Sequence, residues 1–313
     1  MLVFLLIIAL KKVKPQSMRM KITELVIISG IILLTILLPS FTNEPQMAIT
    51  HSYSVDSLGA CQGISCQNGK IFMYGDREVG MIREYRSDGD SLIYNNKEMK
   101  LTLNDTDVIN HPTGLAYHDN NPVFIGNSIR LNKEGTLWRA VIYCIDWKGL
   151  QRTGTLDGNL LNTIDDDTCI QGTRPEYVQY KNKWYVATAD YGDKANEVRL
   201  YDPSLLKKAK KTSEKGLLYK KFTCTPWVQN LFWMADKGML VLIQNQIEGR
   251  KWRFTYVDLD KSVADGKQSV VKVIDIDRGD ELEGFTFLNN QYTSGIAVTS
   301  SRKNNVNIMN VQW

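Results

Sequence analysis

The stretch Cys61–Asp76, CQGISCQNGKIFMYGD, decides the fold of this chain because four degenerate copies of it follow. Each copy has an alternating apolar run, a polar turn with Asn, Asp or Gly, and a second apolar run, which is the pattern of a β-hairpin. The copies are HPTGLAYHDNNPVFIGN from His111, RPEYVQYKNKWYVATAD from Arg174, WVQNLFWMADKGMLVLIQN from Trp227 and LEGFTFLNNQYTSGIAVTSS from Leu282. The chain is therefore built from a repeated hairpin.

The hairpins recur at a nearly constant spacing along the chain. Taking Gly63, Gly114, Tyr177, Asn230 and Gly284 as equivalent positions, successive repeats lie 51, 63, 53 and 54 residues apart. A period of this length in a sequence of strands is typical of a propeller, a solenoid or a repeat array.

A third strand follows each hairpin, and a fourth strand follows the first four. The third strands end at Tyr85, Ile145, Tyr201, Val257 and Val311. Tight turns are expected after the first four of them, at RSDG, DWKG, DPSL and DLDK. The fourth strands are SLIYN from Ser91, LQRTGTL from Leu150, GLLYKKF from Gly216 and VVKVIDI from Val270. Four antiparallel strands in each repeat make the blade of a β-propeller.

The fifth repeat has only three strands, and a strand near the start of the chain has no hairpin partner. This strand is AITHSYSV, Ala48–Val55. We expect it to complete the last blade, since closing the ring removes exposed sheet edges. The sequence thus predicts an all-β fold in residues 43–313, a β-propeller of five four-stranded antiparallel blades. Six blades are the alternative, and the 63-residue spacing is where a sixth would have to lie.

The repeats resemble the β-propeller superfamily, especially the six-bladed NHL and gluconolactonase-like groups and the five-bladed plant-type glutaminyl cyclases. The local resemblance to the cyclases is in the first blade, which in that family opens with a step similar to Gln62-Gly63-Ile64 and continues into a strand similar to Lys70–Tyr74. The family carries a catalytic glutamate on this second strand, where the present sequence has Met73. The resemblance therefore implies the fold and leaves the cyclase activity without its catalytic residue.

Residues 1–42 differ in composition from the repeats. Leu25–Leu38 is an uncharged apolar run of 14 residues, preceded by Arg19 and Lys21. A bilayer span needs about 20 apolar residues, so this run favours a signal peptide cleaved near Thr42. A retained membrane anchor is the alternative. We therefore predict an exported protein, periplasmic or extracellular, or one anchored to a membrane through residues 25–38.

The charge of the chain is concentrated in the same segment. The whole chain has a formal net charge of +4, and residues 1–42 account for all of it. The propeller region is formally neutral, which removes the electrostatic reason to expect nucleic acid as a partner. The five cysteines have no CxxC spacing, so zinc is not favoured. We expect a monomer.

A ring of blades gathers polar residues at one end of its central channel. We expect a first ring where the inner strands begin, made of Gln62, Thr113, Glu176, Gln229 and Glu283. A second ring follows where the next strands end, made of Asp76, Asn127, Asp190, Asn245 and Ser300 or Ser301. Oxygen ligands without histidine suit a hard cation, which makes Asp76 and Asp190 candidate Ca²⁺ ligands. The alternative is that strand ends favour Asp and Asn for turn geometry alone.

Further candidates surround these rings. Arg174 suits a clamp for a carboxylate or phosphate, or else an ion pair with a glutamate of a neighbouring blade. Trp227 and Tyr191 suit a platform for a sugar ring, and His111 is a candidate base if it has a partner. The predicted ligand-binding residues are Gln62, His111, Arg174, Trp227, Gln229, Asn127 and Asn245. The predicted acid and base of an enzyme are Glu176 and Glu283, since glycosidases use two carboxylates.

Three functions fit this pattern. The first is an exported propeller that binds a small molecule or glycan at the channel mouth, with Ca²⁺ as the only cofactor to consider. The second is a hydrolase or lactonase-type enzyme that uses the acidic residues of the same face. The third is a protein-interaction scaffold with an inert channel. The sequence has no nucleophile elbow, Walker loop, dinucleotide fingerprint or HExxH motif, so motifs do not decide among the three.

Overall fold

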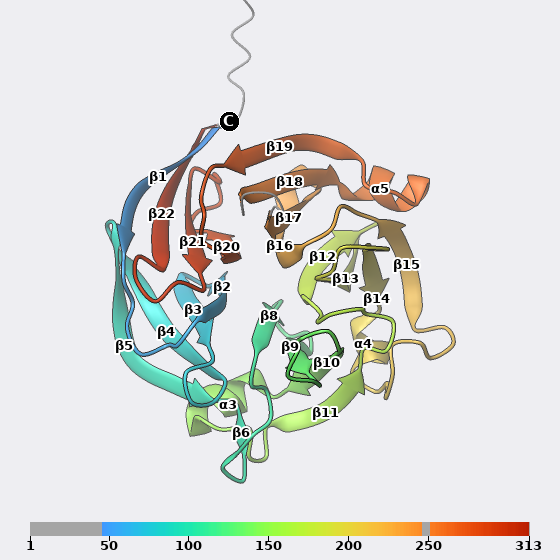
Figure 1. The fold of residues 1–313 in the computed structure, drawn as a ribbon. Coiled ribbons are helices and arrows are strands. Elements are labelled where there is room, and N and C mark those ends of the chain that lie inside the picture. The colour runs from blue at the N-terminus through green and yellow to red at the C-terminus, as the bar shows by residue number, and fades with distance from the viewer. Residues whose placement is uncertain (1–45, 246–250, 313) are drawn as a thin grey trace, which may run out of the picture. The chain divides into compact units, whose positions relative to one another are not determined.

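The chain forms a five-bladed β-propeller (Figure 1). The structure is a computed structural model and describes residues 46–245 and 251–312. Five four-stranded antiparallel sheets surround a central axis in the order of the sequence (Figure 1). The predicted all-β fold and the five blades are confirmed. The six-bladed alternative is wrong, because the long spacing between the second and third repeats holds a helix and loops, with no further hairpin.

Each blade runs from an inner strand at the axis to an outer strand at the rim. Blade one contains β2 (Cys61–Gln67), β3 (Lys70–Gly75), β4 (Met81–Asp88) and β5 (Ser91–Lys100). Blade two contains β8 (Pro112–Ala116), β9 (Val123–Arg130), β10 (Trp138–Ile145) and β11 (Leu160–Asp165). Blade three contains β12 (Glu176–Tyr180), β13 (Lys183–Ala189), β14 (Glu197–Tyr201) and β15 (Leu218–Thr223). Blade four contains β16 (Val228–Met234), β17 (Met239–Asn245), β18 (Trp252–Asp258) and β19 (Val270–Ile276). A short ribbon of β6 (Thr102–Leu103) and β7 (Thr106–Asp107) follows blade one.

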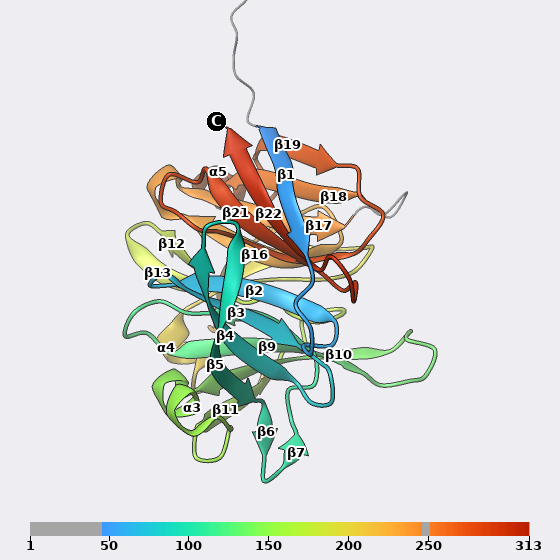
Figure 2. The ribbon, with the colours of Figure 1, turned by 90° about the vertical axis from the view of Figure 1, so that its left-hand side faces the viewer.

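Blade five joins the two ends of the propeller sequence. Counted from the axis, its first three strands are β20 (Leu282–Phe287), β21 (Ser294–Thr299) and β22 (Val306–Gln312). Its outer strand is β1 (Gln46–Tyr53). β1 pairs antiparallel with β22, from Gln46 opposite Gln312 to Tyr53 opposite Val306 (Figure 2). The prediction that the N-terminal strand completes the last blade is confirmed.

Three of the predicted tight turns are short helices. They are α3 (Trp147–Thr153), α4 (Pro203–Leu206) and α5 (Leu259–Asp265), and a 3₁₀ turn, η2 (Ala235–Lys237), lies in blade four. Each of the three helices begins after an aspartate whose side chain accepts a backbone N–H of the first turn, namely Asp146, Asp202 and Asp258. Such N-caps stabilise helix starts. The predicted strand from Leu150 is therefore wrong, since α3 occupies its first residues and the fourth strand of the blade is β11.

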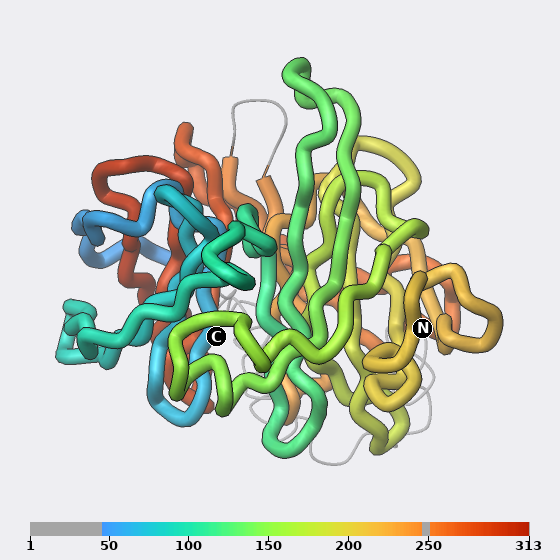
Figure 3. The backbone as a smooth tube through the Cα atoms, turned by 90° about the horizontal axis from the view of Figure 1, so that it is seen from below, coloured from blue at the N-terminus to red at the C-terminus, as the bar shows by residue number. Residues whose placement is uncertain are grey.

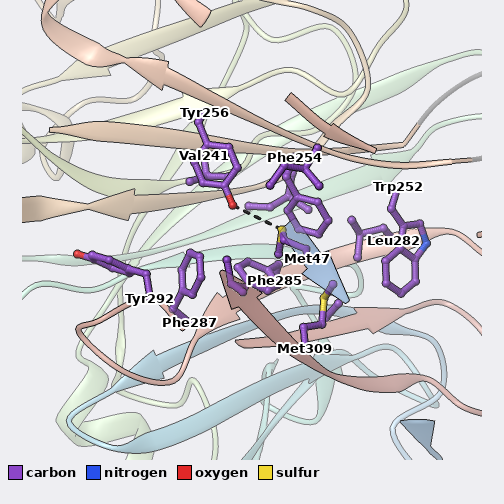
Figure 4. Packing of buried hydrophobic residues seen from close by; sticks show 14 of the residues in the cluster. Met47, Val241, Trp252, Phe254, Tyr256, Leu282, Phe285, Phe287, Tyr292 and Met309 are labelled. Carbon is purple, nitrogen blue, oxygen red and sulfur yellow. Dashed lines mark hydrogen bonds between the residues drawn. The ribbon is translucent and has the colours of Figure 1, made fainter. Parts of the chain in front are cut away.

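The hydrophobic core is divided among the interfaces between neighbouring blades. Residues 46–245 and 251–312 form five buried clusters, and each joins side chains from two adjacent blades. Figure 4 shows the cluster between blades four and five, in which the ring centres of Phe254 and Phe285 lie 5.1 Å apart and Trp252 lies beside Leu282. Met47 of β1 packs into the same cluster, and the Tyr256 hydroxyl donates to its Sδ at 3.5 Å. The closing strand thus contributes to the core as well as to the sheet.

Some predictions concern parts of the chain that are not described. The predicted signal peptide or anchor at residues 1–42, with the apolar run 25–38, lies outside the described residues, so export and membrane anchoring stay predictions. Across residues 46–245 and 251–312, no helix is both long enough and apolar enough to cross a bilayer. All five cysteines are free thiols.

Candidate functional site

Four of the five inner strands carry a β-bulge at the end where they begin. The register shifts at Gln62 in β2, Thr113 in β8, Gln229 in β16 and Glu283 in β20. All four residues were expected in the first ring, and all four side chains are buried. A bulge leaves one residue out of the ladder and changes where its side chain points. The same device therefore recurs around this end of the channel, which we name the mouth.

The third inner strand has no bulge and begins differently. β12 pairs with β13 from Glu176 opposite Ala187, and an isolated bridge between Thr173 and Asp190 continues the same register. Arg174, two residues earlier, supplies the buried polar side chain at the mouth. Glu176 lies further along the channel, on the wall of a cavity. The placement of Glu176 in the first ring is therefore wrong, because that ring depends on a bulge that this blade lacks.

Arg174 is the centre of a hydrogen-bond network across blades three, four and five. Its guanidinium donates to Gln229 Oε1 at 2.8 Å and to the Gln229 carbonyl at 3.3 Å. Gln229 Nε2 donates in turn to Glu281 Oε1 at 3.1 Å, which also accepts from the Tyr191 hydroxyl at 3.2 Å. The Arg174 guanidinium lies 5.1 Å from the Tyr191 ring centre, a cation–π distance. The predicted partner of Arg174 was a glutamate or an anion, and its direct side-chain partner is a glutamine.

Trp227 and Tyr191 lie together at the mouth, as expected for a platform. Their ring centres are 5.0 Å apart with the planes at 72°. Trp227 has a φ of 66°, a left-handed conformation that costs a residue with a side chain about 1–3 kcal/mol. Its N–H donates to the Gly192 carbonyl and its carbonyl accepts from Asn245, so both sides of the backbone are fixed. Among the described residues its indole Nε1 has no acceptor.

Glu283 is buried at the mouth without a hydrogen bond to any described residue. Glu283 is only 6% exposed. Burial raises the pKa of Glu283 well above its usual value, and the nearby charge of Glu281 raises it further. The Arg174 guanidinium acts in the opposite direction. The net direction is upward, so this side chain favours the neutral acid.

The second ring binds the backbone where the chain enters the blades. Four of its five members accept a backbone N–H: Asp76 from Ala60, Asn127 from His111, Asp190 from Ile170 and Asn245 from Leu282. These bonds are 2.8–3.0 Å long. At the fifth position the backbone takes part instead, since the Ser300 N–H donates to the Glu281 carbonyl. The four side chains hold the backbone at strand ends, which agrees with the alternative that Asp and Asn occur there for structural reasons.

The two aspartates offered as calcium ligands already accept bonds through both carboxylate oxygens. The second oxygen of Asp76 accepts from Gln62 Nε2 at 3.0 Å, and that of Asp190 from Arg199 at 3.0 Å. In the described part of the chain, no group of three or more His, Cys, Asp or Glu side chains is arranged to hold a metal ion. Calcium stays a prediction, and thermal melts with and without EDTA test it.

His111 has a carboxylate neighbour at the mouth. Its Nδ1 lies 3.8 Å from Asp76 Oδ2, and its side chain is about one-third exposed. This distance is too long for a direct hydrogen bond. Asp76 is thus the carboxylate neighbour that a histidine base would need. A catalytic role for His111 stays a prediction.

A cavity of about 200 Å³ occupies the channel beyond the mouth. All five blades line it: blade three contributes the first residues of its inner strand, Glu176 and Tyr177, and the other four contribute residues from the middle and end of theirs. Its aromatic rings include Tyr117, Trp184 and Trp233. Among the described residues that line it, Glu176 is the only one with a carboxyl group. Burial raises the pKa of Glu176 to about 8. These aromatic residues were not singled out from the sequence as site residues; Trp233 in β16 and Tyr117 just after β8 could have been found from their places at the ends of inner strands.

The two predicted catalytic carboxyls belong to different surroundings. Glu176 lines the cavity, and Glu283 interacts with the charges of Glu281, Arg174 and Asp76 at the mouth. Neither carboxyl contributes to the pKa shift of the other. The structure does not bring them together as an acid and base pair.

The sheet topology defines the class of fold, a five-bladed β-propeller. No family model matches the chain, and no curated protein matches it. The chain is similar to the structure of U3-55K, with 7% identity, a TM-score of 0.43, and coverage of 85% of this chain and 100% of that one. It is similar to the WD40 repeats of RRP9, with 8% identity, a TM-score of 0.44, and coverage of 86% and 100%. A chain in the Mitotic Checkpoint Complex has 9% identity, a TM-score of 0.38, and coverage of 80% and 63%.

Proposed function

We propose that this protein is a non-catalytic binding protein whose mouth face docks another protein. The observation that carries the proposal is the hairpin of β9 and β10. It extends past the bulge at Thr113 and projects along the propeller axis beyond the rest of the mouth face (Figure 3). Its tip carries Leu131 and Leu137, which are 52% and 56% exposed. Apolar side chains held out from a surface in this way mark protein contacts.

The hairpin tip is held rigid from within. Leu131 N–H donates to the Leu137 carbonyl at 2.8 Å, so the two leucines lie opposite each other. The Asn132 side chain accepts from the N–H groups of Thr136 and Leu137, each at 3.0 Å. Trp138 Nε1 donates to the Gly135 carbonyl at 2.7 Å. A tip that is ordered before contact loses little conformational entropy on binding, which favours affinity.

A further apolar side chain lies in the loop next to this hairpin. Ile170 is 49% exposed. Its loop packs on β9, since a Cβ placed on Gly172 would come within 2.6 Å of Ser128 Oγ. The partner that fits this surface has an apolar groove that receives the two leucines and contacts Ile170 at its edge.

Comparative affinity capture tests the proposal. Bait proteins are the unmodified chain, a Leu131→Ser and Leu137→Ser double variant, and a Leu161→Ser and Leu205→Ser control, whose leucines are 62% and 50% exposed elsewhere. We expect a protein that the unmodified chain and the control retain and the hairpin variant loses at least tenfold, followed by the same loss with the purified partner. Equal retention by all three baits overturns the proposal.

A second candidate function is the binding of a small molecule or glycan at the mouth. Two observations favour it: Glu283 is buried without a hydrogen bond, and Trp227 is strained with an indole N–H that lacks an acceptor among the described residues. A ligand with a donor and an acceptor would satisfy both groups. Titration with a panel of sugars and small acids, repeated on Glu283→Gln, tests this candidate, and a panel without saturable binding rejects it.

A further inference from the structure

In the described part of the chain, the wall of the channel cavity has one carboxyl group among aromatic rings, and its only basic residue is a histidine. The wall includes Trp184, Trp233, Tyr117, Phe232 and Phe285. Aromatic faces carry negative electrostatic potential and attract cations, most strongly when the site is shielded from water. The wall therefore suits a positively charged ligand in preference to an anion.

The carboxyl group in this cavity is only partly engaged. Glu176 Oε1 accepts the Tyr177 N–H at 2.8 Å, and Oε2 has no donor among the described residues. The cavity also contacts Trp233, whose indole Nε1 has no acceptor in the described part of the chain. The channel thus contains an unused acceptor and an unused donor.

The remaining titratable groups of the wall leave Glu176 as the group that would meet a cation. His118 stacks on Trp184 with ring centres 3.7 Å apart. Its two ring nitrogens lie 3.1 Å from Asn121 Nδ2 and 3.8 Å from Asp119 Oδ2. The other titratable groups of the wall are Cys66 from β2, Tyr117 after β8 and Tyr177 from β12, while β16 and β20 contribute none. Burial raises the pKa of Cys66 and of Tyr177, so both are neutral at physiological pH.

The volume of the cavity limits the size of the ligand. At about 200 Å³ it is smaller than the sites of about 300–1,000 Å³ that take drug-sized molecules. A single ammonium group with a few methyl substituents is of the right order. Quaternary ammonium groups are also the cations that aromatic sites recognise best, because they give up little hydration.

We propose that the channel cavity binds a methylated ammonium group between its aromatic rings and the Glu176 carboxylate. This site is independent of the protein-docking surface on the mouth face. The same chemistry is carried by a free quaternary amine such as choline and by a methylated lysine side chain, and the experiment below separates the two sources.

Binding of a cation is linked to the proton on Glu176. Burial raises the pKa of Glu176 to about 8, so the acid is mostly neutral in the empty cavity at pH 6. The cation requires the carboxylate, and its affinity therefore rises as the proton leaves. Below the pKa the affinity changes about tenfold for each pH unit, which gives about 50-fold between pH 6 and pH 8.

Isothermal titration calorimetry on the full chain tests the site. The probes are choline, a trimethyllysine peptide with its unmethylated counterpart, and dimethylbutanol, the neutral carbon isostere of choline. The variants are Glu176→Gln and, as a matched control on the exposed surface of α5, Asp265→Asn. Thermal melts at pH 5 are the check that both variants are folded.

We expect saturable binding of choline or of the methylated peptide at pH 8, weaker by at least tenfold at pH 6. Glu176→Gln should weaken it at least tenfold, and Asp265→Asn should leave it unchanged. Binding of choline alone assigns a free amine, and binding of the peptide assigns a side chain. The proposal fails if neither probe binds at pH 8, if dimethylbutanol binds equally well, or if the folded Glu176→Gln variant binds as tightly as the unmodified chain.

Discussion

Single residues at the mouth stabilise one another, and this limits what they can do chemically. The Arg174 guanidinium donates to Gln229 and lies over the Tyr191 ring, and the Gln229 side chain donates in turn to Glu281. Buried polar groups in such a network are costly to leave unpaired, so each partner fixes the next. A substrate anion would have to displace Gln229 from Arg174. The network therefore favours a structural role for Arg174 over a clamp for a ligand.

Glu176 gives a pH dependence of stability with a definite sign. Burial raises its pKa from 4.5 to about 8 on folding, so the folded protein holds this proton more tightly than the unfolded chain. The stabilisation is fully present below pH 4.5 and is lost as the pH rises toward 8. Glu176→Gln keeps the neutral form at every pH. We expect its free energy of unfolding to exceed that of the unmodified chain by on the order of 2–4 kcal/mol at pH 9, and to match it at pH 4.5.

Urea unfolding at a series of pH values measures this difference. Asp265→Asn, an exposed change on α5, is the control and should follow the curve of the unmodified chain. If the free energy of unfolding changes with pH in the same way for Glu176→Gln and the unmodified chain, the carboxyl group ionises in the folded state as it does in water.

At the level of elements, the blades share a way of turning from their third strand to their fourth. In three blades an aspartate at the end of the third strand caps a short helix, and this helix lies in the connection to the outer strand, which pairs with the third strand. In α5 the Asp258 side chain accepts the Lys261 N–H at 2.9 Å. The cap fixes where the helix begins, and with it the place where β19 can start.

Replacing this cap should weaken blade four measurably. Asp258→Ala removes the acceptor and should lower the free energy of unfolding by about 1 kcal/mol. Asp258→Asn keeps the capping oxygen and should cost only a few tenths of that amount. Chemical denaturation of the two variants distinguishes the hydrogen bond from the charge, since equal losses in both would assign the effect to the Lys261 ion pair at 3.4 Å.

The sequence was sufficient to predict those elements that depend on interactions between residues close together in the chain. Alternating apolar runs with polar turns predicted the hairpins, and their period predicted the blades, because neighbouring strands in a blade are also neighbours in the chain. Turn and helix were confused at Asp146, Asp202 and Asp258, since aspartate favours both a tight turn and an N-cap. Glu176 was misplaced because a bulge depends on how the partner strand pairs. Arg174 and Gln229 are 55 residues apart, so only the closed ring could show that they meet.

At the level of the whole molecule, the propeller depends on the pairing of β1 with β22. The strand supplies Met47 to the cluster between blades four and five and covers the edge of blade five. A buried methionine contributes about 2–5 kcal/mol, and the lost ladder bonds add to this amount. An uncovered β22 would also be an edge open to aggregation.

Deletion of residues 46–53 tests the closure. We expect the deleted chain to lose its cooperative thermal transition or to melt at least 10 °C lower, and to aggregate on standing. A synthetic peptide with the sequence of residues 46–53, QMAITHSY, should restore part of the melting temperature, and a scrambled peptide should not. An unchanged melting temperature after the deletion would show that blade five is stable with three strands.

The pairing of β1 with β22 also orders events during synthesis. Thr50 bonds to the carbonyl of Ile308, 258 residues later. At roughly 5–20 residues per second, a ribosome needs on the order of 10 to 50 s after making β1 to make its partner β22. A nascent chain that stalls inside blade five has four nearly finished blades and an unprotected first strand, so translation pauses within the codons of blade five should be the ones that recruit chaperones.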